Sequence, residues 1–256
     1  MDIARGNWIG FVDSDDWLES NALEVLYKKQ KDTDADIVMG GFREIYPNYT
    51  APYLFPSVTA TDDILVYFFN NRCKFLHGKL YRKYLFDNYY VPKTNIGEDA
   101  LVSVQLFAII THEKLQKVDL IIYNYDRRTG GIMSQFSNTT NYKAFTDYPM
   151  LQACLFMENM VDKIHQNKEI YSSFLRYMLV VGIIPYLSFN RLKSKKEVNL
   201  FYQTYYRPCE IKHKIHFINR MIVPLFRFSM GIGTVYVFLL NRVEFLRPFI
   251  KRIFYR

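Results

Sequence analysis

Short apolar runs separated by polar turns fill the first half of the chain, and their periods predict a mixture of strands and helices. Residues 7–12 form an apolar run that ends at Asp13, which predicts a short buried strand. Residues 37–46 alternate loosely and predict a second strand, in which the glycine pair 40–41 indicates a bulge or a close backbone approach. β-Branched and aromatic residues dominate residues 118–125, which predicts a third strand.

Helical spacing of apolar residues occurs between these strands. Ser20 is a candidate N-cap for a helix over residues 21–31. A polar pair at 61–62 is a candidate cap for a short helix that ends near residue 69, and a third helix is predicted from Glu98 to about residue 110. In the first of these helices the apolar side chains share one face, formed by Leu23, Leu26 and Tyr27.

The segments that remain in the first half predict loops and one mixed element. Residues 47–60 contain three prolines and predict a loop. Residues 75–86 have a mixed pattern, which fits the end of a strand followed by a helical turn. Residues 126–131 are polar and predict a second loop.

Alternating strands and helices over residues 1–145 predict an α/β domain with a mixed, Rossmann-like sheet. After this point the strand signals fade, and helical patterns interrupted by prolines run nearly to the end. We therefore predict a mostly helical second region over residues 146–256. The apolar segments 178–189 and 221–240 are too short or too interrupted to predict membrane-spanning helices.

Composition and charge separate the two regions further. Half of the 256 residues are apolar and 17% are aromatic, enough for a large core and too many for a disordered chain. Residues 1–150 carry 16 Lys and Arg against 19 Asp and Glu, whereas residues 151–256 carry 17 against 6. A basic region is attracted to anionic surfaces, so the second region is predicted to lie on a membrane face. A helical subdomain with solvated arginines fits the same pattern, and no motif predicts nucleic-acid binding.

The cysteines and the first residues bear on the cellular compartment. Cys73, Cys154 and Cys209 are far apart, odd in number and without CxxC spacing, so we predict reduced, buried thiols. The start of the chain lacks the pattern of a signal peptide, because its apolar run is short and ends in carboxylates. The expected location is the cytoplasm, peripherally at the inner face of the cell membrane.

Three carboxylates crowd together directly after the first predicted strand. Asp13, Asp15 and Asp16 repel one another unless water or a cation neutralises them. Ligands of open α/β sheets bind at the carboxyl ends of strands, and alternate carboxylates can reach one hard cation there. The cluster therefore predicts a Mg²⁺ or Mn²⁺ site, although a solvated turn before the next helix has the same composition.

The stretch ARGNWIGFVDSDDW resembles the signature of family 2 glycosyltransferases, in which a strand of the GT-A fold ends in a DxD motif. Three further stretches resemble the family in the same order. Residues 75–83 are similar to its "klYr" segment, and NIGEDALVSVQLF is similar to its ED motif at the head of the acceptor-site helix. Residues 123–131 resemble the strand and Arg-bearing loop that follow that helix.

The resemblance implies a role for each matching residue. Asp13 and Asp15 would bind the metal ion of a nucleotide sugar, and Asp16 would order their loop. Asp99 would be the general base that deprotonates the acceptor hydroxyl, with Glu98 supporting it. A carboxylate at a helix N-terminus is held ionised by the helix dipole, which suits a base, although simple helix capping also favours acidic residues there.

Basic side chains near these motifs are candidates for substrate contacts. Arg127 or Arg128 would pair with the diphosphate, since forked guanidinium groups bind phosphate oxygens well, although exposed arginines are commonly just solvated. His77 is a candidate for the acceptor site. His213 and His216 have the spacing HxxH but no convincing acidic or Cys partner, and we predict no metal site there.

The family resemblance covers residues 1 to about 135. It implies an enzyme that transfers a sugar from a nucleoside diphosphate sugar to a glycan or lipid-linked acceptor and inverts the anomeric centre. The implied process is surface polysaccharide synthesis. Family members carry a nucleotide-binding half before the DxD motif, and the sequence is expected to lack it. An alternative is therefore a truncated, non-catalytic remnant that binds membrane or a partner through its basic tail. A phosphotransferase with Asp13 as nucleophile is disfavoured, because Trp17 stands where such sites usually place Thr or Val.

Overall fold

The computed structural model describes most of the first 183 residues and short parts of the rest: 3–91, 97–127, 149–183, 199, 203, 222–229, 231–233 and 235–236. The chain forms two compact units. One contains residues 1–135 and 153–174, and the other contains residues 136–152 and 175–256. The domain boundary predicted near residue 145 falls outside the described residues.

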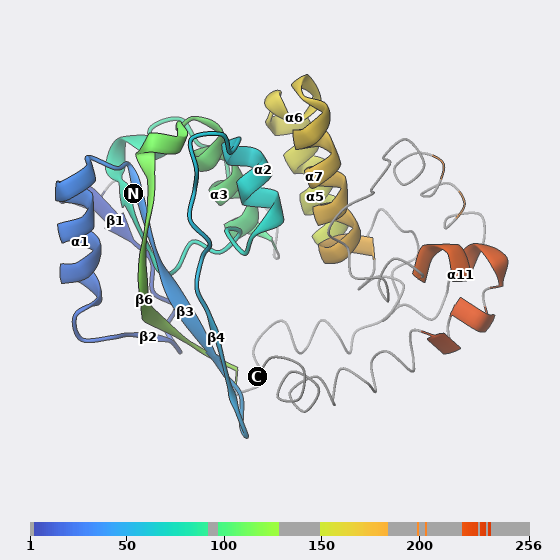
Figure 1. The fold of residues 1–256 in the computed structure, drawn as a ribbon, viewed down its shortest axis with the longest axis horizontal. Coiled ribbons are helices and arrows are strands. Elements are labelled where there is room, and N and C mark those ends of the chain that lie inside the picture. The colour runs from blue at the N-terminus through green and yellow to red at the C-terminus, as the bar shows by residue number, and fades with distance from the viewer. Residues whose placement is uncertain are drawn as a thin grey trace. The chain divides into compact units, whose positions relative to one another are not determined.

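A mixed sheet forms the centre of the first unit (Figure 1). Its strands are β1 (Trp8–Gly10), β2 (Trp17–Leu18), β3 (Ile37–Ile45), β4 (Thr50–Tyr53), β5 (Lys79–Arg82) and β6 (Leu115–Asp126). The order across the sheet is β1-β5-β3-β6-β2, and β4 pairs with β3. β3 and β6 run parallel, whereas the other pairs are antiparallel. The predicted α/β class is confirmed.

Helices alternate with these strands and continue along the chain after the last of them. They are α1 (Ala22–Thr33), α2 (Ile64–Asn70), α3 (Glu98–Ala108), α5 (Pro149–Met160), α6 (Lys163–Gln166), α7 (Lys168–Met178) and α11 (Ile222–Phe228), with a π-helix at Leu179–Ile183 and 3-10 turns at Lys83–Phe86 and His112–Lys114. Aromatic rings join α2, α3 and α7, because Phe68 contacts Phe107 and Phe69 contacts Phe174. Within the described residues, no helix combines the length and the apolar character needed to cross a membrane.

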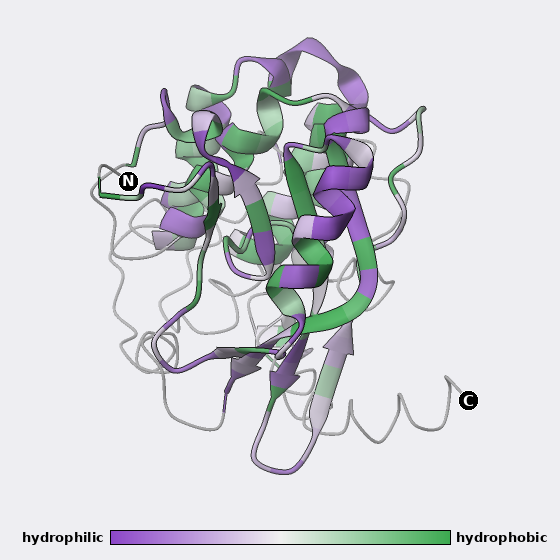
Figure 2. Cartoon of the chain, turned by 90° about the vertical axis from the view of Figure 1, so that its left-hand side faces the viewer, coloured by the Kyte–Doolittle hydropathy of each residue, from purple (hydrophilic) through white to green (hydrophobic). Residues whose placement is uncertain are grey.

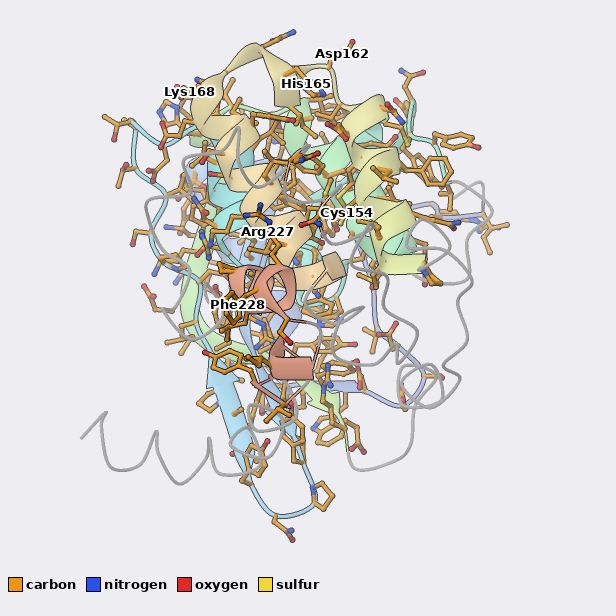
Figure 3. All side chains as sticks on the ribbon, turned by 90° about the vertical axis from the view of Figure 1, so that its right-hand side faces the viewer. Cys154, Asp162, His165, Lys168, Arg227 and Phe228 are labelled. Atoms are coloured by element: carbon orange, nitrogen blue, oxygen red, sulfur yellow. The ribbon has the colours of Figure 1, made fainter. Side chains whose placement is uncertain are left out.

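The buried thiols agree with the sequence prediction. Cys73 and Cys154, the latter on α5 (Figure 3), are free and fully enclosed. Burial raises the pKa of each thiol to about 12, so both stay protonated and behave as small apolar side chains. Cys209 lies outside the described residues.

The predicted apolar face of α1 was wrong in part. Leu26 is buried, but Leu23 and Tyr27 are 60% and 48% exposed, and Figure 2 shows hydrophobic as well as hydrophilic residues on the outward surface of this helix. The buried positions are Ala22, Leu26 and Gln30, each four residues after the last. Leu23 and Tyr27 each follow a residue of that row by one position, which places them about 100° further around the helix, because one turn takes 3.6 residues.

Other local predictions also needed correction. Asn21 stands at the N-cap of α1 instead of Ser20, and its side chain makes no capping hydrogen bond. The predicted loop over residues 47–60 contains β4, which pairs with β3 as the outer strand of a hairpin. Pro52 fits this edge position because it needs no amide hydrogen for a further partner.

The glycine pair in β3 makes the close approach that the sequence predicts. A Cβ atom at Gly40 would lie 2.3 Å from Cγ1 of Ile122 on β6, and one at Gly41 would lie 2.8 Å from the carbonyl oxygen of Tyr53. The pairing register of β3 with β6 shifts at these two glycines. Ile122 thus packs directly against the β3 backbone, and Tyr123 beside it belongs to the candidate site.

Replacing Gly40 by alanine is expected to destabilise the protein by about 1–3 kcal/mol, because the new methyl group overlaps Ile122 at the parallel pair. Urea unfolding followed by circular dichroism measures the loss. Gly10→Ala is the matched control, since its Cβ would meet only the carbonyl oxygen of Lys79 at an ordinary 3.7 Å. Equal stability of the two variants would contradict the close packing of β3 on β6.

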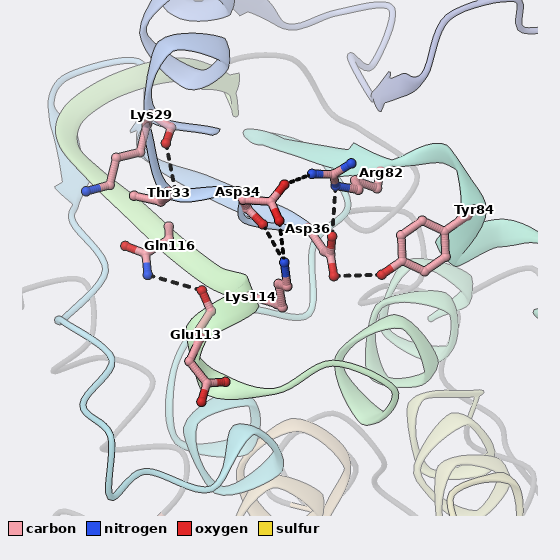
Figure 4. Close-up of polar contacts among 9 residues, drawn as sticks. All are labelled: Lys29, Thr33, Asp34, Asp36, Arg82, Tyr84, Glu113, Lys114 and Gln116. Atoms are coloured by element: carbon pink, nitrogen blue, oxygen red, sulfur yellow. Dashed lines mark hydrogen bonds and ion pairs between the residues drawn. The ribbon is translucent and has the colours of Figure 1, made fainter. Parts of the chain in front are cut away.

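An ion-pair network joins the elements at the starting end of β3 and β6 (Figure 4). Asp34 pairs with Arg82 and with Lys114, whose Nζ is 2.7 Å from its carboxylate. Arg82 also contacts Asp36 at 2.9 Å, and the hydroxyl of Tyr84 donates to Asp36 at 2.6 Å. The acidic and basic groups at this end therefore neutralise one another.

Candidate active site

The candidate site lies at the carboxyl ends of β1, β3 and β6. β1 runs parallel to β3 because both pair antiparallel with β5, so Asp13, which follows β1, lies at the end where β3 and β6 finish. His77 comes just before β5 begins and therefore lies at the same end. Tyr123 is near the end of β6. This is the edge at which open α/β sheets bind their ligands.

Asp16 is held firmly by the last residues of β6. The Tyr123 hydroxyl donates to Oδ2 of Asp16 at 2.6 Å, and the backbone N–H of Asp126 donates to Oδ1 at 2.8 Å. The backbone N–H of Asp13 in turn donates to the Tyr123 hydroxyl at 3.1 Å. Burial raises the pKa of Asp16 despite these hydrogen bonds. The arrangement fits the loop-ordering role that the sequence predicts for Asp16.

His77 is enclosed by aromatic rings and faces Asp13 with its edge. Its ring stacks on Tyr123 with centroids 4.2 Å apart and on Phe75 at 4.9 Å. Nδ1 lies 3.8 Å from Oδ2 of Asp13, which is longer than a hydrogen bond. The imidazole lowers the pKa of Asp13, and burial lowers the pKa of His77.

The ligand atoms of Asp13, Asp16 and His77 all lie within 4.8 Å of one another. Two carboxylates and a buried imidazole are a donor set that suits a divalent cation. Asp15, which the sequence predicts as a ligand, is exposed on the same turn and stands outside this group.

Asp99 lies at the N-terminus of α3 and faces the same site. Gly97 precedes the helix with a φ of 84°, a left-handed conformation that glycine adopts without strain. Burial, together with the negative charges of Glu98 and Asp13, raises the pKa of Asp99 to about 6. Asp99 is thus mostly ionised at neutral pH, and its carboxylate accepts a hydrogen bond from the backbone N–H of Leu76, next to His77.

Lys79 is a buried cation that sequence reasoning missed. The residue is 3% exposed, and its Nζ donates to the carbonyl oxygens of Phe75 and His77. Burial lowers its pKa to about 8, and its remaining positive charge lowers the pKa of Asp99. A lysine inside the apolar run FLHGKLYR was the available signal, because such a charge needs a partner.

Arg127 lies at the end of β6 and shares one carboxylate with a second arginine. Nε of Arg127 is 3.3 Å from Oε1 of Glu44, and Arg72 binds both oxygens of Glu44 at 2.8 and 3.0 Å. The Arg127 guanidinium also lies over the ring of Tyr125, 4.9 Å from its centroid. Two cations around one anion leave a net positive charge beside the site. Arg128 lies outside the described residues.

The mixed sheet and its helices form an α/β fold of the GT-A type. Residues 1–90 match the model of Glycosyl transferase family 2. Glycosyltransferase GlyA of Streptococcus pneumoniae is 24% identical over 197 residues, which span 69% of this chain and 27% of GlyA. Glycosyltransferase GlyG of the same organism is 27% identical over 148 residues, 52% of this chain and 48% of GlyG. The chain thus spans less than half of each curated relative.

Solved structures agree on the fold. S. aureus TarS 1-349 in complex with UDP-GlcNAc aligns with a TM-score of 0.58 at 17% identity, over 95% of this chain and 70% of that one. S. aureus TarS in a longer form aligns with a TM-score of 0.52 at 15% identity, over 92% and 40% of the two chains. The resemblance stated from the sequence motifs is confirmed.

Proposed function

We propose that this chain carries out the transfer of a sugar from a nucleoside diphosphate sugar to a hydroxyl of a glycan or lipid-linked acceptor, in the synthesis of a surface polysaccharide. The observation that carries the proposal is the group of Asp13, Asp16 and His77, whose possible ligand atoms lie within 4.8 Å of one another at the carboxyl end of the sheet. Asp99, the candidate base, accepts a backbone hydrogen bond from Leu76, the residue before His77. The TarS complex with UDP-GlcNAc supports a nucleotide sugar as donor.

The donor's diphosphate is proposed to meet positive charge from two sources. A bound Mg²⁺ or Mn²⁺ would stabilise the negative charge that grows on the departing diphosphate. Asp13 would hold this ion and Asp15 would reach it from the same turn. Asp16 would keep the turn in place and would offer the ion a second carboxylate. Arg127, together with Arg128, would bind diphosphate oxygens, because Glu44 is shared with Arg72 and leaves guanidinium N–H groups available.

Asp99 is proposed to act as the general base. Its carboxylate takes the proton of the acceptor hydroxyl while that oxygen bonds to the anomeric carbon. The bond from this carbon to the diphosphate breaks on the opposite face, which inverts the anomeric configuration. The Leu76 N–H and the charge of Lys79 keep Asp99 ionised, and the neighbouring charge of Glu98 makes it a stronger base.

Donor binding tests the proposal directly. Calorimetric titration of the folded chain with uridine and guanosine diphosphate sugars, with and without Mn²⁺, is expected to show metal-dependent binding. A folded chain that binds none of these donors would contradict the proposal and favour a non-catalytic remnant.

The pH dependence of transfer is expected to follow the ionisation of Asp99. Because only the ionised carboxylate accepts a proton, kcat/KM should rise with pH and reach half its maximum near the Asp99 pKa of about 6. Glu98→Gln removes a negative neighbour and lowers this pKa, so the acid limb should move to lower pH. Initial rates across about pH 4.5–8 measure the shift.

Glu113→Gln is the control for this profile, since Glu113 is an exposed carboxylate beside His112 and outside the site. An acid limb that stays in place in Glu98→Gln, or that moves equally in Glu113→Gln, would argue against Asp99 as the titrating base.

A further inference from the structure

We infer that His77 is a direct nitrogen ligand of the divalent cation at Asp13 and Asp16, an inference that rests on the proposed function of this site. The Nδ1 atom lies 3.8 Å from Oδ2 of Asp13. Two ligands that are each about 2.1 Å from one ion can be this far apart, so the gap that is too long for a hydrogen bond suits a shared metal ion.

The burial of His77 supplies an independent reason. The side chain is 3% exposed, and neither ring nitrogen has a hydrogen-bond partner among the described residues. Buried polar atoms in native proteins are nearly always paired with protein, water or an ion. A cation between the imidazole edge and the Asp13 carboxylate would satisfy Nδ1 in this position.

Aromatic stacking orients the imidazole toward the carboxylates. Tyr123 and Phe75 lie nearly parallel to the His77 ring, with interplanar angles of 7° and 13°. The same Tyr123 donates its hydroxyl hydrogen to Asp16. One side chain therefore orients two of the three ligands, as residues around metal ligands commonly do.

This role differs from the acceptor-site role that the sequence suggests for His77. Both faces of its ring are covered by aromatic side chains, so the histidine cannot offer a face to a sugar. Only the ring edge is directed at Asp13. An edge nitrogen can bind a metal ion without leaving the stack.

A nitrogen ligand also determines which metal the site prefers. Mg²⁺ favours oxygen ligands and keeps its waters, whereas imidazole binds transition metals more strongly. The protein is therefore expected to bind Mn²⁺ at least about tenfold more tightly than Mg²⁺. Asp13, Asp16 and His77 form this site without any contribution from a nucleotide.

Calorimetric titration of the chain with MnCl₂ and MgCl₂ tests the assignment. His77→Gln is expected to weaken Mn²⁺ binding by about tenfold or more and to reduce the preference for Mn²⁺, because loss of a ligand exceeds the effect of losing its supporting residues. His112→Gln, a histidine paired with Glu113 away from the site, should bind Mn²⁺ as the unchanged protein does. Unaltered Mn²⁺ affinity in folded His77→Gln would overturn the inference.

A spectroscopic measurement covers the case in which His77→Gln does not fold. Electron spin echo modulation of Mn²⁺ bound to the double variant His213→Gln, His216→Gln should show coupling to a directly bound ¹⁴N nucleus. Labelling histidine with ¹⁵N should replace the ¹⁴N coupling with a ¹⁵N coupling. Bound Mn²⁺ without nitrogen coupling, or no Mn²⁺ binding at all, would overturn the inference.

The proposed sugar transfer and the proposed His77 ligand would be contradicted by different results. Metal-dependent donor binding that is insensitive to His77→Gln would contradict the nitrogen ligand and leave the proposed transfer in place. Nitrogen-bound Mn²⁺ in a protein that binds no nucleotide sugar would support the ligand and contradict the transfer.

Discussion

Replacing Asp99 by asparagine is expected to slow sugar transfer by about 10²–10⁴-fold, the usual contribution of a positioned general base. Asparagine has nearly the same shape but cannot accept the hydroxyl proton. Donor affinity should remain, because the cation group of Asp13, Asp16 and His77 is unchanged. Initial rates and donor calorimetry measure both quantities. Weakened donor binding with normal turnover would contradict this role.

The same variant should unfold less readily at neutral pH. The pKa of Asp99 is about 6 in the folded protein and 3.8 for an ordinary aspartate. Between these two pH values the folded protein binds more protons than the unfolded chain. The free energy of unfolding therefore falls as the pH rises from 3.8 to about 6. Above this window the ionised, buried carboxylate destabilises the fold by on the order of 2 kcal/mol, which asparagine removes. Melting temperatures of the two proteins should therefore differ at neutral pH and converge near pH 4. A constant difference at every pH would exclude this explanation.

Replacing Asp13 by asparagine is expected to weaken donor binding in the presence of Mn²⁺ by about 100-fold, the upper range for disturbing a metal site. The neutral amide loses the charge that attracts the ion and that faces His77. In the presence of a metal chelator the substitution should change donor binding little, since binding without the metal ion does not use the Asp13 carboxylate. Calorimetry with and without Mn²⁺ separates the two cases.

Asp32→Asn is the matched control for this experiment, because Asp32 is an exposed carboxylate on α1. The control should bind donor normally. If Asp13→Asn also binds donor normally in Mn²⁺, the cation is held elsewhere and the proposed arrangement of the site is wrong.

Elements that are visible in local periodicity were predicted well from the sequence. The strand at 37–46 and the helix that begins at Glu98 appear as β3 and α3, and the glycine pair 40–41 indeed marks a close approach. These features depend on neighbouring residues alone. β2, with only two residues, has no period to detect and exists because it pairs with β6.

The site could be predicted only as far as its motifs are continuous in sequence. The DSDDW and GED motifs indicated Asp13 and Asp99, and the position of Asp13 at the edge of the sheet follows from the strand order. The grouping of Asp13 and Asp16 with His77 could not be predicted. Tyr123, which is more than 100 residues from both aspartates in sequence, binds the Asp16 carboxylate and stacks on the His77 ring. The burial of Lys79 likewise depends on packing between distant segments.

The attachment of the Asp16 turn to β6 has a consequence for the movements of this region. Glu19 donates its backbone N–H to Ile122, and Asp16 accepts from Tyr123 and from the N–H of Asp126. The amide protons of Glu19 and Asp126 should therefore exchange with deuterium only when β6 itself opens, unlike those of an ordinary binding loop. The turn that carries Asp13 and Asp16 would then keep its geometry on warming until the sheet melts, and the proposed metal affinity would be lost in one cooperative step.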